Sequence, residues 1–188
     1  GEFPAEDLIR FFSKFNHFKN PHVLEIGCGP GGNINFFITK NIRYTGIDIS
    51  SIAIKNALKK YKKVPDLTLI NNDFIEYNFD KNKYNFLVDN CSSCCLPFQK
   101  RIYFYEKISK SLKKNGVIFM RTFSNKCILN IHEKIKANEF FEPKKILNGV
   151  GKINFLNKNN IFKIFNQNFK IIYLEEITRS LESQKFLI

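Results

Sequence analysis

Four acidic residues stand at or near the ends of successive apolar segments: Glu25, Asp48, Asp73 and Asp89. The first lies in "VLEIGCGPGGN" (23–33), just before a turn in which Gly27, Gly29 and Gly32 satisfy the spacing G-x-G-x-x-G. Glycine lets the backbone approach a ligand closely, and this spacing between a strand and a helix is typical of nucleotide binding. Taken alone, the turn fits NAD as well as other nucleoside ligands.

The acids separate these ligands by charge and position. Asp48 lies about 20 residues after Gly27, where a carboxylate binds ribose hydroxyls. An anion at Glu25 repels a pyrophosphate but can help hold an ammonium or sulfonium group. Asp73 and Phe74 offer a carboxylate and a ring face to an adenine. Four acids around one crevice suit a cationic ligand with a ribose and an adenine, and S-adenosylmethionine is such a molecule. The alternative is that Asp48 and Asp73 only cap turns, a frequent role of Asp after a strand.

Strand and helix patterns alternate along the chain. Apolar runs predict strands over 22–27, 43–49, 67–73, 84–90 and 117–123, and amphipathic spacing predicts helices over 4–18, 33–41, 52–61 and 101–114, the last closed by Asn115-Gly116. A helix over 157–167 and strands over 169–178 and 184–188 follow. This order predicts an α/β, Rossmann-like, doubly wound and mostly parallel sheet, with helices on both faces and an antiparallel C-terminal strand. Residues 1–188 are expected to form a single domain, with a lid or acceptor-binding insertion at about 124–156.

Five motifs in the expected order resemble the class I S-adenosylmethionine-dependent methyltransferases, especially bacterial enzymes that act on small molecules. They are "VLEIGCGPGGN", "YTGIDIS", "NNDF", "YNFLVDN" and "ISKSLKKNGVIFMRTF". Five ordered motifs are far more specific than one. The resemblance implies S-adenosylmethionine as cofactor, S-adenosylhomocysteine as product, and methyl transfer to a sugar or another metabolite.

The same resemblance assigns roles by position. It implies that Gly27, Gly29 and Gly31 pass under the methionine part and the ribose, and that Glu25 and nearby backbone hold the amino-acid part. Asn33 is counted among the cofactor-binding residues. It implies further that Asp48 binds the ribose, that Ile49 flanks the adenine, that Asp73 and Phe74 contact the adenine, and that Asp89 and Asn90 lie near the transferring methyl.

Methyl transfer from a sulfonium depends mainly on alignment of the acceptor. A general base is needed only for a hydroxyl or a protonated amine. Asp89 and His132, the latter in the expected lid, are the candidates for that role.

The formal net charge of +13 leaves nucleic acid as a possible partner. The charges are spread along the chain, however, and "CSSCCLPF" (91–98) does not match the Asn/Asp-Pro-Pro-aromatic motif of enzymes that methylate base amino groups. An RNA methyltransferase is therefore the first alternative. A nicotinamide oxidoreductase and a non-catalytic partner with the same fold are the others.

The five cysteines, without a signal-like segment or an apolar run near ~20 residues, favour a reducing cytoplasm and no membrane span. Cys91, Cys94 and Cys95 form a C-x-x-C-C cluster, but His17, His22 and His132 are scattered, so four ligands cannot be assembled from the sequence. No metal is expected. The acceptor and the oligomeric state are not encoded in any recognisable pattern.

Overall fold

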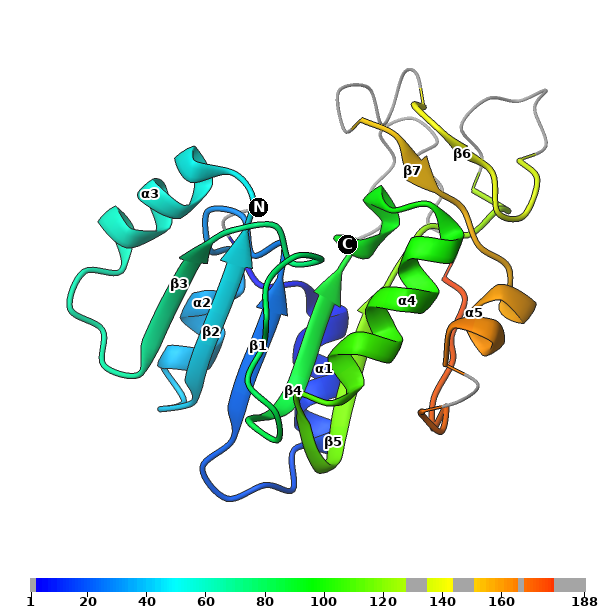
Figure 1. Cartoon of the computed structure of the whole chain (residues 1–188). Coiled ribbons are helices and arrows are strands. Elements are labelled where there is room, and N and C mark those ends of the chain that lie inside the picture. The colour runs from blue at the N-terminus through cyan, green and yellow to red at the C-terminus, as the bar shows by residue number, and fades with distance from the viewer. Residues whose placement is uncertain (1–2, 128–134, 144–150, 166–167, 178–188) are drawn as a thin grey trace, which may run out of the picture.

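The structure is a computed structural model that describes residues 3–127, 135–143, 151–165 and 168–177. Five parallel strands form one sheet in the order β3-β2-β1-β4-β5 (Figure 1). Their bounds are His22–Ile26 for β1, Arg43–Asp48 for β2, Leu67–Asn71 for β3, Tyr84–Asn90 for β4 and Leu112–Arg121 for β5. The order reverses at β1, so β1 and β4 flank the crevice where ligands bind in sheets of this kind. The Rossmann-like prediction is confirmed.

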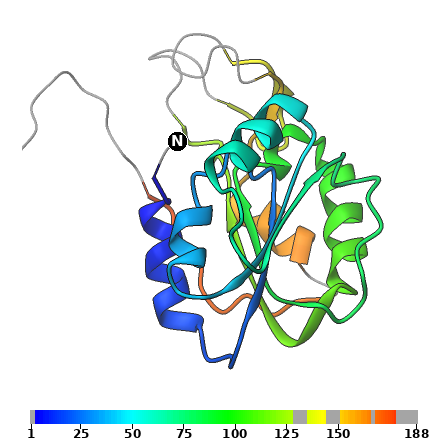
Figure 2. The same cartoon turned by 90° about the vertical axis from the view of Figure 1, so that its left-hand side faces the viewer.

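Helices cover both faces of the sheet, because its central strands are apolar on both sides. One face carries α1 (Glu6–Phe15), α2 (Ile34–Ile38) and α3 (Ser51–Lys60), and the other carries α4 (Phe98–Ser109) and α5 (Lys158–Phe165) (Figure 2). Leu8 and Phe12 of α1 pack with Phe37 of α2 in the first layer. Phe104 of α4 and Ile161 of α5 belong to the second.

Local signals explain where α3 begins and ends. The Ser50 side chain accepts a hydrogen bond from the Ala53 N–H at 3.2 Å, as an N-cap does. Lys59 and Lys60 occupy the last turn, where positive charge suits the helix dipole. Ser50 is therefore the N-cap of α3.

The junction between α4 and β5 differs from the prediction. The helix ends at Ser109 and β5 already begins at Leu112, which pairs with Tyr84. Asn115 has a φ of 63°, and the β4–β5 register shifts between Tyr84 and Phe86. Asn115-Gly116 therefore forms an irregularity inside the strand, and it does not close the helix. The sequence signal for a turn was right, but its place in the fold was wrong.

The expected strand over 169–178 is wrong for the residues that the structure describes. Residues 169–177 form no strand, whereas β6 (Phe140–Phe141) and β7 (Ile153–Asn154) form a short antiparallel pair. Side-chain contacts hold residues 169–177 in place: Glu175 pairs with Arg10 of α1 at 2.7 Å, and Glu176 pairs with Lys126 at 2.7 Å. The predicted strand over 184–188 lies outside the described residues.

The β6–β7 pair lies beyond the carboxyl ends of β4 and β5 (Figure 1). It packs against the short 3-10 helix η1 (Ser93–Cys95) through Ile153, Phe155 and Cys94. This position agrees with an insertion near the crevice, and its function as a lid stays a prediction. In the described part of the chain, no helix combines the length and apolar character needed to cross a bilayer.

Candidate cofactor and acceptor site

The glycine turn after β1 adopts a backbone that only glycine takes easily. Gly27 and Gly29 have φ values of +60° and +55°. A Cβ on Gly27 would lie 2.2 Å from the Ser92 side-chain oxygen, so the turn packs tightly against the segment after β4. A Cβ added at Gly29 would meet nothing within 4 Å. The turn is therefore closed on one side and open on the other, as a cradle for a ligand requires.

Asp48 ends β2 beside this open space. Its Oδ2 accepts a hydrogen bond from the Gly29 N–H at 2.8 Å, and its Oδ1 accepts one from the Ser50 N–H at 2.8 Å. The two bonds fix the orientation of the carboxylate. Each oxygen keeps a second lone pair for a donor such as a ribose hydroxyl. Asp48 thus caps its turn. These contacts are compatible both with a role as a turn cap and with a role in ligand binding.

Glu25 lies inside the sheet layer and is 2% exposed. Asn33 donates a hydrogen bond from its Nδ2 to Glu25 Oε1 at 2.6 Å, and the Tyr44 hydroxyl donates one to Oε2. Burial raises the pKa of Glu25 to about 7, and the charges of Asp89 and Asp48 add to that rise, while the two hydrogen bonds oppose it. Glu25 is consequently a buried acid whose pKa lies near neutral pH.

Asp89 is the last residue but one of β4, opposite Ile26, on the face of the sheet covered by α4. Its Oδ1 accepts hydrogen bonds from the Ser92 N–H at 2.9 Å and the Ser93 N–H at 3.0 Å. Its Oδ2 accepts bonds from the hydroxyls of Ser93 and Tyr105. The carboxylate is fully buried and held by four protein donors, which favours a positioning role for η1. Its assignment to catalysis stays a prediction.

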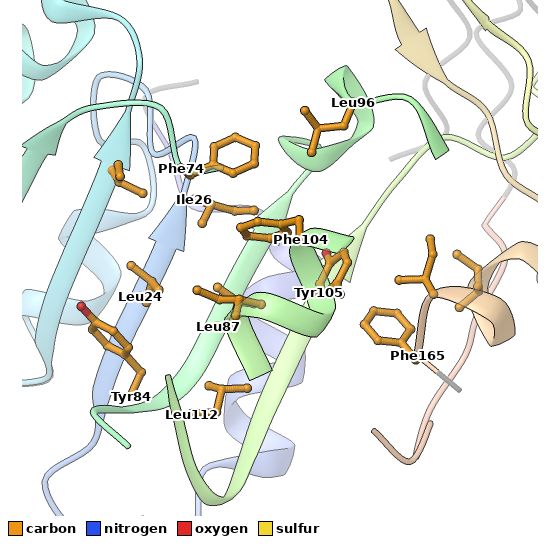
Figure 3. Close-up of a cluster of buried hydrophobic side chains, with 14 of the residues drawn as sticks. Leu24, Ile26, Phe74, Tyr84, Leu87, Leu96, Phe104, Tyr105, Leu112 and Phe165 are labelled. Carbon is orange, nitrogen blue, oxygen red and sulfur yellow. The ribbon is translucent and has the colours of Figure 1, made fainter. Parts of the chain in front are cut away.

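The residues predicted around the adenine occupy two environments. Ile49 is 71% exposed after β2, a free apolar surface beside Asp48. Phe74 is buried, and its ring lies 5.0 Å from that of Phe104, close to Ile26 and Leu96 (Figure 3). Asp73 accepts a hydrogen bond from the Ile75 N–H at 2.9 Å, which makes it a turn cap. Ile49 can pack on a ligand directly, whereas Phe74 belongs to the wall behind it.

The structure brings most of the predicted residues to the carboxyl edge of β1, β2 and β4. Asn90, the last residue of β4, is half-buried beside Arg121 of β5. Both polar atoms of the Asn33 side chain bond to the protein, because its Oδ1 also accepts a hydrogen bond from the Ala5 N–H at 3.0 Å. Gly31 has a φ of +89° and sits against Ile34 and Tyr61. His132 lies outside the described residues.

Sequence reasoning missed several residues that shape this site. Tyr44 and Tyr105 hold the two buried acids, Ser92 closes the glycine turn, and the Asn71 Nδ2 donates to the backbone oxygens of Asp48 and Ile49 at 3.0 Å each. The register explains Asn71, because Asp48 and Asn71 pair at the ends of β2 and β3. The sequence signal that could have identified Asn71 is that two apolar strands end at the same edge of the sheet.

Within the cysteine cluster, Cys91 and Cys94 pack against the β6–β7 pair, whereas Cys95 is exposed. The Cys94 thiol donates to the Cys91 carbonyl at 2.8 Å. Burial raises the pKa of Cys91 to about 11 and raises that of Cys94 further. A thiol whose pKa is raised in this way is a poor nucleophile, so these side chains act as small packing groups.

Comparison with known proteins identifies the class. A protein family described as a methyltransferase domain matches residues 17–185. The chain therefore belongs to the methyltransferase domain family, in the class I group that uses S-adenosylmethionine as the methyl donor and releases S-adenosylhomocysteine. The open cradle at Gly29 and the fixed carboxylate of Asp48 fit such a nucleoside.

Individual relatives act on different acceptors. The chain is 26% identical over 160 residues to malonyl-[acyl-carrier protein] O-methyltransferase 1 of Ilyobacter polytropus, with 84% of this chain and 56% of that protein covered. It is 28% identical over 158 residues to a tRNA (guanine-N(7)-)-methyltransferase of Clostridium botulinum, with 73% and 71% covered. Thus the chain spans only about half the length of the first of these relatives.

The fold is shared with a solved S-adenosylmethionine-dependent methyltransferase of Methanosarcina mazei. The two structures superpose with a TM-score of 0.67 at 17% sequence identity, over 87% of this chain and 84% of that one. At this identity the likeness establishes the fold and leaves the acceptor open.

Proposed function

We propose that this chain transfers the methyl group of S-adenosylmethionine to a small-molecule acceptor, a sugar or another metabolite with a hydroxyl or amine. The observation that carries the proposal is the arrangement of Asp48 at the end of β2. Its carboxylate is oriented by the N–H groups of Gly29 and Ser50, next to the open side of the glycine turn. A ribose placed there finds two fixed acceptors for its hydroxyls.

The acceptor is proposed to enter between the carboxyl ends of β4 and β5 and the segment of about 124–156. Methyl transfer is a displacement at carbon with a good leaving group, so alignment at near-attack distance supplies most of the acceleration. Asp89 holds η1 beside Asn90 and thereby shapes the wall of this pocket. If the acceptor is a hydroxyl, a base is needed, and Asp89 and His132 remain the candidates.

Thermal unfolding with S-adenosylmethionine, S-adenosylhomocysteine and NAD tests the cofactor part. At about 100 times its dissociation constant, a ligand adds about 2.7 kcal/mol, a rise of about 5 to 10 °C for a domain of this size. The rise is expected with both adenosyl ligands and absent in Asp48→Ala. The exposed Asp80, which pairs only with Lys83 among the described residues, provides the matched control Asp80→Ala. A rise with NAD alone would sink the proposal.

RNA is the second candidate acceptor, favoured by the net charge of +13 and by the relative that acts on tRNA. Binding through phosphates weakens by about a thousandfold or more between about 50 mM and about 200 mM salt. The protein is first saturated with S-adenosylhomocysteine and then titrated with an unmodified tRNA transcript at both salt concentrations. The result distinguishes RNA from a small-molecule acceptor. Tight binding of the transcript that weakens steeply with salt would make RNA the proposed acceptor in place of a small molecule.

A further inference from the structure

Arg101 is a fully buried arginine in the first turns of α4. Its Nη2 donates a hydrogen bond to the Thr122 Oγ1 at 3.1 Å and lies 3.6 Å from the Met120 sulfur. Its Nε and Nη1 are buried without a hydrogen-bond partner, and none of the described carboxylates lies within 4.0 Å of the guanidinium. One N–H on Nε and two on Nη1 are thus left without an acceptor.

Such a group is costly unless something compensates it. A guanidinium stays charged at any physiological pH, and a buried charge needs a partner that is both anionic and hydrogen-bonded. Asp89, which accepts a hydrogen bond from Tyr105 of the same helix, is the candidate within the site. Its two oxygens, however, already accept four hydrogen bonds from Ser92, Ser93 and Tyr105. The described part of the chain therefore supplies this cation without a counter-ion.

The position of Arg101 places this cation on the acceptor side of the crevice. Thr122 directly follows β5, whose last residue Arg121 pairs with Asn90 of β4. The charge of Arg101 also lowers the pKa of the Cys91 and Cys94 thiols against the effect of burial, so it lies near the loop after β4. The glycine turn follows β1 and Asp48 ends β2, and both strands lie on the other side of β4 in the sheet.

We propose that Arg101 determines the specificity for the acceptor by binding a carboxylate or phosphate group of that molecule. This inference rests on the proposed methyl transfer and adds the charge of the substrate to it. The anion approaches from the carboxyl edge of the sheet, where Met120, Thr122 and Cys91 are half-buried, and it reaches the buried Nε and Nη1 only when the side chains that cover them move aside. Its oxygens accept the free N–H groups on Nε and Nη1, and these charge-assisted bonds replace the missing counter-ion.

The first test is thermal unfolding of the protein saturated with S-adenosylhomocysteine, in sodium malonate or sodium phosphate against sodium chloride of equal ionic strength. One of the two anions is expected to raise the unfolding temperature by about 3 °C or more at about ten times its dissociation constant. A rise with malonate identifies a carboxylate and a rise with phosphate identifies a phosphate. If neither exceeds chloride, the inference is overturned, while the rise caused by S-adenosylhomocysteine separately decides the proposed function.

Variants then locate the effect. Arg101→Met removes the charge and keeps an apolar stem, so the anion-specific rise should vanish while the rise caused by S-adenosylhomocysteine persists. Arg43→Met makes the same charge change at the exposed start of β2, where Arg43 meets Asp66, and it should keep both rises. Loss of S-adenosylhomocysteine binding in Arg101→Met would assign the arginine to the cofactor and overturn the inference.

A further variant covers the case in which Arg101→Met does not fold. Arg101→Lys keeps the charge but presents three donors in place of five, and it should weaken anion binding at least about tenfold. Equal anion binding by wild type and Arg101→Lys would overturn the inference. The acceptors are then supplied as pairs, a carboxylate with its amide or a phosphate ester with its alcohol. The wild type should prefer the anionic member of each pair. Arg101→Lys should raise the KM for the anionic acceptor and leave kcat unchanged.

Discussion

The hydroxyl of Tyr44 on β2 donates a hydrogen bond to the carboxylate of Glu25 on β1, inside the sheet layer. This bond crosses between two neighbouring parallel strands, directly below the glycine turn. Together with Asn33 it fixes Glu25 in a position from which water is excluded. The folded protein therefore favours the neutral carboxyl, and the pKa of Glu25 rises to about 7.

Glu25→Gln should remove a pH dependence of stability. The pKa of Glu25 is about 7 in the folded chain against 4.5 ordinarily, so its contribution is fully present below about pH 4.5 and is lost as the pH rises through about 7. The loss amounts to about 3 kcal/mol, at 1.36 kcal/mol per pKa unit. Denaturant unfolding between these pH values measures it in wild type, in Glu25→Gln, and in the exposed control Glu106→Gln. A wild-type profile as flat as that of Glu25→Gln would contradict the prediction.

Binding of S-adenosylhomocysteine should depend on the same proton. If the ligand's ammonium group lies near Glu25, it favours the charged carboxylate. Binding then strengthens about tenfold as the pH rises from about 6 to about 8, since the charged fraction grows across the pKa of about 7. Calorimetry in two buffers of different ionisation enthalpy detects the released proton. Glu25→Gln should bind more weakly and without proton release, and a proton release that survives in the variant would move the titrating group elsewhere.

The two glycines of the turn should respond differently to alanine. Gly27→Ala places a Cβ 2.2 Å from the Ser92 Oγ at a φ of +60°, and it should cost at least about 2 kcal/mol of stability. Gly29→Ala meets open space, so only the backbone strain of about 1 kcal/mol applies, but the new methyl group enters the cradle and weakens cofactor binding. Adding Ser92→Gly to each variant provides the check: it should restore part of the stability to Gly27→Ala and none to Gly29→Ala.

His22 should produce a pH effect of the opposite sign. Its Nε2 lies 2.9 Å from Thr45 Oγ1, and burial, together with the charges of Arg43, Lys83 and Lys113, lowers its pKa from 6.5 to about 4. The neutral ring is favoured in the fold, so its contribution is present above about pH 6.5 and is lost as the pH falls through about 4. Glu25 changes the stability with the opposite sign over an overlapping pH range. The pH profile of His22→Gln is therefore compared with those of Glu25→Gln and of the double variant. A double variant that keeps the acid-side slope would contradict the assignment.

The parts of the fold and site that the sequence predicted are those with local signals. Apolar runs marked all five strands, and glycine spacing with a following acid marked Gly29 and Asp48, which the structure joins at 2.8 Å. Tyr44, Tyr105 and Arg101 were missed because each acts on a residue far along the chain. Their types are also typical of a helix or strand core, so nothing in the sequence separates them from packing residues.

The errors near the C-terminus have a related cause. Alternating apolar residues over 169–177 indicate a strand, but Phe169 and Ile171 pack against the core while Ile172 and Tyr173 are exposed. Ion pairs with α1 and with Lys126 replace a strand ladder there. Such pairs depend on which elements become neighbours in space, and that information is absent from the local pattern.

The bond between Tyr105 and Asp89 leads to a last prediction, on the division between positioning and chemistry. Tyr105→Phe removes one of four donors from the buried carboxylate, and leaving that oxygen short of a partner should cost about 1 to 3 kcal/mol of stability. If Asp89 only positions η1, the variant should lower kcat by a similar modest factor for hydroxyl and amine acceptors, because no proton passes to this carboxylate. If Asp89 is instead the general base, kcat should fall at least about tenfold with a hydroxyl acceptor and little with a neutral amine, which needs no base. Ser93→Ala removes another hydroxyl from the same Oδ2 and should reproduce whichever behaviour Tyr105→Phe displays. Disagreement between the two variants would show that the hydroxyls of Tyr105 and Ser93 act on Asp89 in different ways.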